Sequence, residues 1–299
     1  MNKGVVSVLV AYLIWGLYPL YFHAMQHVAP TEIVIHRVLW TFALLAVYLF
    51  CSRRWRWIQK AITDRRTVAV FLMSSVLITA NWSTYTYAIV TNQTLEASLG
   101  YFMNPLVSVL LGTVFLKEKL NKAQMLAIVF ACAGVMWVTF KQGEFPALGL
   151  TLALSFGFYG LVRKMAPLGS LEGLTLETAF AFPVALLATF YFAGNGDLTF
   201  VHGTSWDKFW LIMAGPITTI PLILFAYGLK QVPYSTVGFI QYLSPTMVFF
   251  IGLFFFGEEL QVDRLIGFIL IWAGVLIFVG ENFFRSHSGY RTEFNQLSK

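Results

Sequence analysis

The chain has 299 residues, of which 58% are hydrophobic and only 11% are charged. Soluble domains usually carry about 25% charged residues, so a water-soluble fold would lack the polar surface needed to cover its core. The net charge of +6 does not indicate nucleic acid as a partner, because the basic residues gather in loops between apolar segments.

Apolar stretches of about 20 residues, each long enough to cross a hydrocarbon core of about 30 Å, recur along the chain. In chain order the ten predicted membrane spans cover residues 4–24, 31–51, 67–90, 97–116, 120–141, 146–164, 172–193, 206–228, 235–256 and 261–283. The first run continues past Pro19 without a small-x-small cleavage site, so we interpret it as a retained helix. Cys51 and Cys132 lie far apart and predict neither a disulfide nor a metal site.

The distribution of Lys and Arg predicts the orientation of the chain. If the amino terminus is cytoplasmic, 16 of these residues fall in inside segments and three, Lys141, Lys208 and Arg264, fall outside. The 16 are Lys3, Arg53, Arg54, Arg56, Lys60, Arg65, Arg66, Lys117, Lys119, Lys122, Arg163, Lys164, Lys230, Arg285, Arg291 and Lys299. Since cytoplasmic loops carry the excess of basic residues, both termini are predicted to be cytoplasmic, and the basic loop from Arg53 to Arg66 is expected to face anionic lipid.

The two halves of the chain are related by an internal duplication. A shift of 140 positions aligns the third to fifth spans of the first half with those of the second, without a gap. It pairs Thr79 with Thr219, Tyr87 with Tyr227, Pro105 with Pro245, Glu118 with Glu258 and Gly134 with Gly274. Because each repeat has five spans, the second must begin on the opposite side of the membrane. We therefore predict two inverted repeats, residues 1–143 and 144–284, followed by a short cytoplasmic tail at 285–299. Inverted repeats are frequent in secondary transporters, with the substrate site between the halves.

The two alternative classes of protein are a membrane-embedded enzyme and a membrane scaffold. Neither GxxxxGK[ST] nor HExxH occurs in the sequence, which leaves no signature for a nucleotide or for catalytic zinc. The predicted topology places Glu118 and Glu258 on opposite faces of the membrane, so they cannot share a substrate. Polar groups near the centres of several spans disfavour a scaffold. We expect no enzyme activity, cofactor or metal.

Five stretches carry a family resemblance: AYLIWGLYP at 11–19, EIVIHRVLW at 32–40, LEASLGYFMNPL at 95–106, FYGLVRK at 158–164 and GFIQYLSPT at 238–246. The chain resembles the RarD-type permeases of the EamA branch of the drug/metabolite transporter (DMT) superfamily over nearly its whole length. The resemblance implies ten helices in two EamA repeats, a bacterial inner membrane, and a cavity lined mainly by the first, third, fourth, sixth, eighth and ninth helices. It also links the chain by name to chloramphenicol.

His36 and Arg37 are the first candidates for a substrate site. An arginine near the centre of a bilayer costs about 2.5 to 3.5 kcal/mol on insertion scales, so a charge inside a span is a functional hypothesis by default. Arg37 would bind a carboxylate with both arms of its guanidinium group, and His36 would carry a proton. The structural alternatives are an Arg37 that extends toward the membrane surface or that pairs with Glu32.

Two acidic residues are candidates for gating or coupling. Glu96 opens the fourth span, where it either caps free backbone amides or forms a gate or a substrate contact at the outer mouth of the cavity. Glu177 lies inside the seventh span and aligns with His36 in the duplication. It either pairs with Arg163, Lys164 or a histidine, or is a protonated buried acid.

The remaining candidates surround two prolines that the duplication places in equivalent positions. Pro105 and Pro245 are expected to interrupt the fourth and ninth spans and to free backbone carbonyls that must meet protein or water. The polar and aromatic side chains expected to line a shared cavity are Asn81, Trp82, Tyr101, Asn104, Tyr159, Gln241 and Tyr242. The alternative is that the amides only join helices, at about 0.6 kcal/mol each.

Together these features predict a secondary transporter of small amphipathic metabolites or drugs, working by alternating access as an exporter. Its partners would be a small-molecule substrate and membrane lipid, and it would be a monomer or a weak dimer. Without an ATP motif, net transport would draw on a proton gradient or a substrate gradient, or would be facilitated diffusion.

Overall fold

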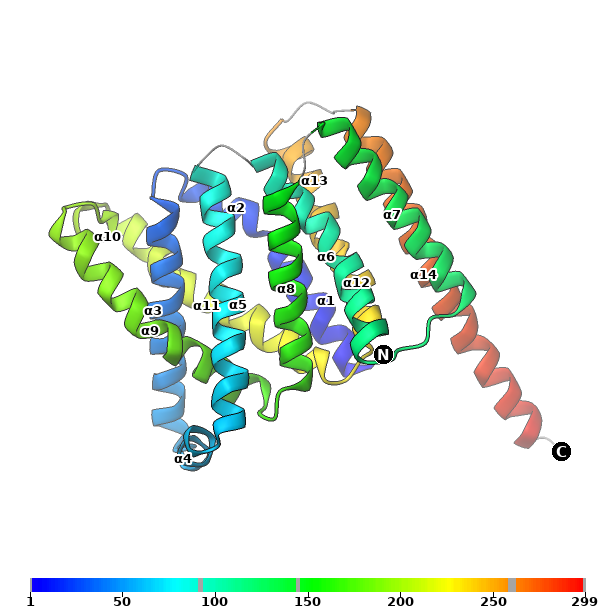
Figure 1. The fold of residues 1–299 in the computed structure, drawn as a ribbon, viewed down its shortest axis with the longest axis horizontal. Helices are drawn as coiled ribbons and strands as arrows, with labels where there is room; N and C mark the ends of the chain where they lie inside the picture. The colour runs from blue at the N-terminus through cyan, green and yellow to red at the C-terminus, as the bar shows by residue number, and fades with distance from the viewer. Residues whose placement is uncertain (1, 91–93, 144–145, 258–261, 298–299) are drawn as a thin grey trace.

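The computed structural model describes residues 2–90, 94–143, 146–257 and 262–297, and every regular element in these ranges is a helix (Figure 1). The first half holds α1 (Lys3–Gly16), α2 (Tyr18–Ala24), α3 (Pro30–Ser52), α4 (Arg56–Thr63), α5 (Arg65–Val90), α6 (Thr94–Phe115) and α7 (Lys122–Gln142). The second half holds α8 (Ala147–Met165), α9 (Ser170–Gly194), α10 (Thr199–His202), α11 (Ser205–Leu229), α12 (Tyr234–Gln241), α13 (Leu243–Phe255) and α14 (Val262–Leu297). The predicted all-helical fold is confirmed for these residues.

Seven helical segments of the described ranges are long and apolar enough to cross a membrane. They are Lys3–Ala24, Pro30–Ser52, Arg65–Tyr85, Lys122–Lys141, Ser170–Gly194, Ser205–Leu229 and Tyr234–Phe255. The other three predicted spans correspond to α6, with an apolar stretch at Gly100–Phe115, to α8, and to α14, with one at Leu265–Glu281. The total of ten spans stays a prediction.

The first and ninth predicted spans are each broken into two helices. The breaks fall at Leu17 and at Tyr242. Pro245 lies three residues after the second break, and its ring removes the hydrogen bond that the Gln241 carbonyl would accept. The expectation that Pro105 interrupts its span in the same way is wrong, because α6 runs continuously from Thr94 to Phe115 with Pro105 inside it. A helix supported by neighbours tolerates one lost bond, and α12 packs closely on α6 here, since a Cβ atom added at Gly238 would lie 2.8 Å from the carbonyl oxygen of Pro105.

Side-chain carboxylates cap the starts of α5 and α12. Asp64 accepts hydrogen bonds from the amides of Arg66 and Thr67, each at 3.2 Å, and so begins α5. Glu118 accepts bonds from the amides of Tyr234 and Ser235, at 2.5 and 2.8 Å, at the start of α12. Glu118 therefore joins the loop after α6 to the second half of the chain.

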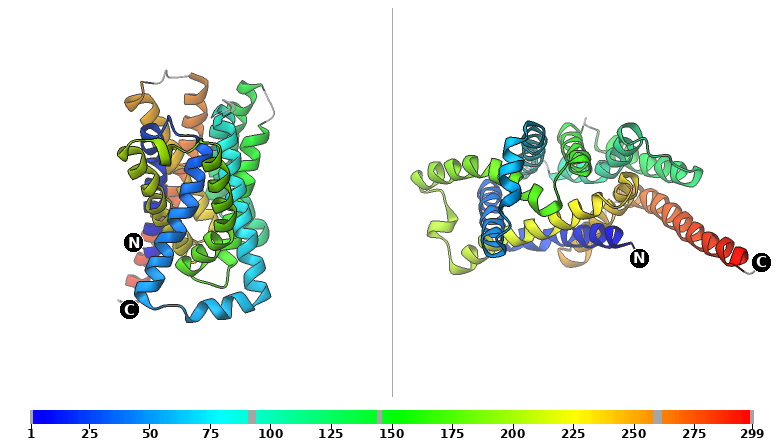
Figure 2. Two further views of the ribbon diagram at one scale, coloured as in Figure 1. Left: turned by 90° about the vertical axis from the view of Figure 1, so that its left-hand side faces the viewer. Right: turned by 90° about the horizontal axis from the view of Figure 1, so that it is seen from below.

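The helices lie in two layers, with α5, α6, α7 and α8 in one and α1 and α11 in the other (Figure 2). Across and within these layers α6 and α5 pack on α8, α1 and α3 pack on α11, α3 packs on α9, and α7 packs on α14. The α7–α14 contact depends on glycine, because a Cβ atom added at Gly134 would lie 2.7 Å from the carbonyl oxygen of Gly267. Both chain ends and α4 lie at the same end of the molecule (Figure 1).

Candidate functional site

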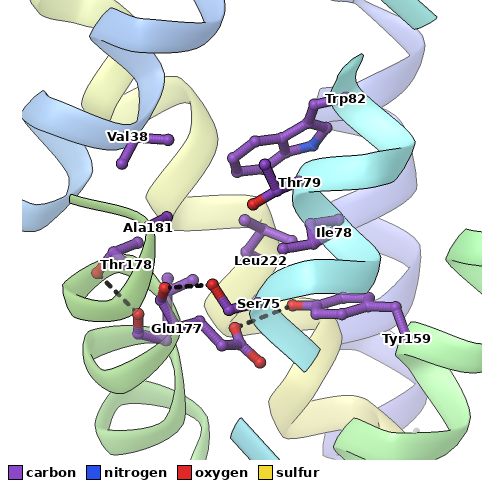
Figure 3. Close-up of a pocket in the computed structure, with 11 residues that line it drawn as sticks. Val38, Ser75, Ile78, Thr79, Trp82, Tyr159, Glu177, Thr178, Ala181 and Leu222 are labelled. Atoms are coloured by element: carbon purple, nitrogen blue, oxygen red, sulfur yellow. Dashed lines mark hydrogen bonds between the residues drawn. The ribbon is translucent and has the colours of Figure 1, made fainter. Parts of the chain in front are cut away.

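A narrow cavity lies where α3, α5, α8, α9 and α11 meet (Figure 3). It is lined by Val38, Ser75, Ile78, Thr79, Trp82, Tyr159, Leu174, Glu177, Thr178, Ala181 and Leu222. The four residues from α5 follow a spacing of three, one and three, so they share one face of that helix. Trp82 closes one end of the cavity, and Glu177 and Tyr159 lie at the other (Figure 3).

The cavity is small in this conformation. The space open to the centres of water-sized molecules is about 10 Å³, which is roughly enough for one water. Drug-sized ligands occupy pockets of about 300 Å³ or more. A substrate of that size would therefore require the surrounding helices to move apart.

Glu177 is the centre of a buried polar cluster at the lower end of the cavity, formed with Ser74, Tyr159 and Arg163 (the Glu177 cluster). The carboxylate accepts hydrogen bonds from Ser74 Oγ at 2.5 Å and from Tyr159 Oη at 3.4 Å. The Nε atom of Arg163 lies 3.3 Å from Glu177 Oε1, and each of these two side chains is only 1% exposed.

The cluster joins three helices, since its members come from α5, α8 and α9. Ser75 Oγ also donates to the backbone carbonyl of Glu177, at 2.8 Å. Of the partners considered for Glu177, the structure places Arg163 beside it. Arg163 Nε makes no hydrogen bond to a described residue, so its contact with Glu177 is an attraction between charges.

Arg37 forms a second buried cluster, at the Trp82 end of the cavity, with Tyr18, Trp82 and Thr218 (the Arg37 cluster). Its Nε–H donates to Thr218 Oγ1 at 2.9 Å. Its Cζ atom lies 4.3 Å from the centre of the Trp82 ring and 5.9 Å from that of Tyr18, distances at which a cation is attracted to an aromatic face. Trp82 thus touches both the cavity and the Arg37 cluster.

Glu32 does not pair with Arg37. Its two carboxylate oxygens accept hydrogen bonds from the amides of Thr199 and Phe200, at 2.9 and 2.7 Å, and His36 Nε2 lies 3.8 Å away. His36 also accepts a bond from Trp40 Nε1 at 2.9 Å and contacts the Phe200 ring. The structure therefore places His36 among α3 and α10 side chains, apart from the cavity.

Asn81 joins two helices rather than lining the cavity. Its Nδ2 donates to the Leu152 carbonyl and to Ser155 Oγ, both at 3.0 Å. Both acceptors belong to α8, so the amide ties α5 to α8.

The residues beside the two prolines are also not part of the cavity wall. Gln241 accepts a bond from Ser108 Oγ at 2.9 Å and so connects α12 to α6, while Asn104 is buried. Tyr242 is buried against Phe102 and Phe268. Tyr101 is 44% exposed and contacts the ring of Tyr85 edge-on. The structure thus distributes these four candidates over the helix contacts around α6 and α12.

The side chain of Glu96 lies outside the described residues. Sequence reasoning did not select the hydroxyl groups of Ser74, Ser75 and Thr218, although all three contact a candidate residue. A signal for them existed, because Ser74-Ser75 and Thr218-Thr219 are adjacent hydroxyl pairs inside otherwise apolar runs. Hydroxyl groups within a span need partners on neighbouring helices or on the preceding helical turn.

Comparison with known proteins gives the sequence relatives of this chain. An uncharacterized transporter of Pseudomonas aeruginosa is 38% identical over 93% of this chain and 93% of its own. The RarD protein of Salmonella typhi is 38% identical over 93% of this chain and 95% of its own. A chloramphenicol-sensitive RarD protein of Pseudomonas aeruginosa is 27% identical over 92% and 93% of the two chains.

A solved crystal structure shares the fold, with a TM-score of 0.68 over 92% of this chain and 98% of the other at 14% identity. The EamA-like transporter family matches this chain twice, at residues 2–140 and at residues 146–280. With these matches and the apolar helices, the chain is a multi-pass protein of the bacterial inner membrane. It belongs to the EamA-like transporter family of the DMT superfamily, with RarD proteins among its relatives.

Proposed function

We propose that this protein is a secondary transporter that exports small amphipathic metabolites or drugs by alternating access between two inverted five-helix repeats. The observation that carries the proposal is the cavity itself, because its wall combines Trp82 and Val38 from the first half with Glu177, Tyr159 and Leu222 from the second. A site between the halves becomes open to one side or the other when the halves rock.

The helix contacts support the repeat arrangement. The first helix of each half packs on the third spanning helix of the other, α1 on α11 and α8 on α5. The last helices of the two halves, α7 and α14, pack on each other. The two family matches, at residues 2–140 and 146–280, divide the chain at the same place as the two proposed repeats. A cytoplasmic position for both termini agrees with the basic loop around α4, which lies at the end of the molecule where the chain begins and ends (Figure 1).

The Glu177 cluster is suited to coupling transport to protons. A proton added to Glu177 would remove its attraction to Arg163, and the carboxylate joins α9 to α5 and α8 through Ser74 and Tyr159. Protonation would therefore loosen three helices that surround the cavity. Within membranes, ionisable residues of this kind mark proton relays and ion pathways.

The proposal is tested by flux in proteoliposomes without ATP. Radiolabelled chloramphenicol is a suitable first probe, because the name of one relative connects it to that drug. We expect a pH gradient to drive uptake against the drug gradient, and an ionophore that collapses the pH gradient to abolish it. Glu177→Gln should keep passive exchange of the drug and lose the response to pH. No difference from protein-free liposomes, for chloramphenicol and for a panel of amphipathic metabolites, would contradict the proposed function.

A further inference from the structure

Arg37 is a buried cation whose hydrogen-bonding capacity is largely unused. The residue is 8% exposed, and its Nε–H donates to Thr218 Oγ1. A guanidinium group has five N–H donors in a planar fork. Thr218 takes one of them and the neighbouring Tyr18 hydroxyl group takes at most one more, so the fork, which matches a carboxylate in geometry, has donors left for a further acceptor.

The carboxylates near Arg37 bind other partners. Glu32, which precedes it on α3, accepts hydrogen bonds from two backbone amides at the start of α10, and Glu177 pairs with Arg163. Among the acidic side chains that the structure describes, none lies within ion-pair distance of Arg37. The Trp82 and Tyr18 rings attract the cation, but they do not neutralise its charge.

Aromatic rings connect Arg37 with the surface. Tyr18 contacts Phe22 at 6.0 Å between ring centres, Phe22 contacts Tyr85 at 5.9 Å, and Tyr85 contacts the exposed Tyr101 at 6.0 Å. This run of rings offers a stacking surface to a planar ligand that approaches the guanidinium group.

We infer that Arg37 binds the carboxylate of an aromatic monoanion, whose ring stacks against Tyr18, Trp82 and Tyr85. The inference rests on the proposed transport function and names the substrate class. A single guanidinium group balances one negative charge, so a monoanion is preferred to a phosphate dianion. The apolar and aromatic surroundings favour a ring over an aliphatic or strongly polar body.

The test compares matched ligands by calorimetry on the purified full chain in nanodiscs. The ligands are 3-phenylpropanoate, indole-3-acetate and benzoate, each beside its primary amide, which has nearly the same shape and no charge. The parent protein should bind at least one acid about tenfold more tightly than its amide, or better. Arg37→Gln should remove this preference and leave amide binding within about twofold, which also shows that the variant is folded.

Lys141→Gln is the charge control, because it removes a half-exposed cation that pairs with Asp263 far from Arg37 in sequence. It should keep the preference for the acid. Arg37→Lys keeps the charge but loses the planar fork, so it should weaken acid binding about fivefold or more, and it decides the question if Arg37→Gln does not fold. A parent that binds no acid, or acid and amide equally, overturns the inference, as does an Arg37→Gln variant that keeps the preference.

An internal partner is the remaining rival, and Glu96 is the residue to examine. If Arg37 pairs with Glu96, the unfolding midpoints of Glu96→Gln, Arg37→Gln and the double variant should fall by the same amount, and the inference is overturned. If the shifts in unfolding midpoint of the two single variants add up in the double variant, Arg37 and Glu96 do not pair, which supports the inference. Chloramphenicol has no carboxylate, so its flux through the parent reports on the proposed function separately. Intact flux without any acid preference overturns only the present inference.

Discussion

The buried pair of Glu177 and Arg163 should contribute a large coupling energy to the stability of the fold. Two unit charges 3.3 Å apart attract each other by roughly 5 kcal/mol at an effective dielectric constant of about 20. Removing one partner leaves the other charge buried and uncompensated, at a cost of about 3 to 5 kcal/mol. Glu177→Gln and Arg163→Gln should each lower the free energy of unfolding by that amount.

The double variant Glu177→Gln/Arg163→Gln should be destabilised by less than the sum of the two single variants, with a coupling energy of about 2 kcal/mol or more. The measurement is equilibrium unfolding in mixed micelles, followed by tryptophan fluorescence. The chain contains a matched control, because Lys141 and Asp263 are also 3.3 Å apart but are 49% and 51% exposed. An exposed pair couples by about 1 kcal/mol or less. A coupling energy no larger for the buried pair than for the exposed pair would refute the reasoning.

Three further predictions concern topology, helix packing and capping. The topology is tested in a Cys51→Ser/Cys132→Ser background with a membrane-impermeant maleimide. Asn195→Cys should react in intact cells, and Gln59→Cys should react only after the cells are permeabilised. The reverse pattern would invert the proposed orientation. Gly134→Ala should destabilise the protein by about 1 to 3 kcal/mol, because its Cβ would lie 2.7 Å from the Gly267 carbonyl oxygen. Gly194→Ala is the control, since its Cβ would meet nothing within 4 Å. Equal unfolding midpoints for the two variants would contradict the packing argument. Hydrogen bonds from Thr67 and from the backbone at Arg66 and Thr67 hold the pKa of Asp64 below its ordinary value of 3.8. The stability that Asp64 contributes is therefore present above pH 3.8 and is lost as the pH falls through the lowered pKa. Asp64→Ala should lower the Tm at neutral pH more than at about pH 3. An equal loss of Tm at both pH values would count against the cap.

The sequence predicted the helical class and the location of the two buried charges well, because both follow from the cost of polar groups in hydrocarbon. A run of apolar residues must become a helix, and Arg37 and Glu177 stand out within such runs. Trp82, Tyr159 and Glu177 were selected from the sequence and line the cavity.

The partner of each charge was harder to predict, because it depends on how neighbouring helices rotate against one another. Glu32 lies near Arg37 in sequence, yet it binds the amides that begin α10, and Arg37 binds Thr218 on α11. The duplication likewise predicts that the segments around Pro105 and Pro245 lie at the same depth in the membrane, but it does not predict whether each helix is continuous. One proline lies in a continuous helix, and the other follows a break at Tyr242.

The most direct test of the central claim fills the cavity and measures transport. Ala181 lines the cavity on α9, and Ala193 is an exposed alanine near the end of the same helix. Ala181→Leu adds more volume than the roughly one water that the cavity admits. It should reduce chloramphenicol flux in proteoliposomes about tenfold or more at matched unfolding midpoints, while Ala193→Leu should leave the flux unchanged. Full flux through Ala181→Leu would contradict a transport route through this cavity.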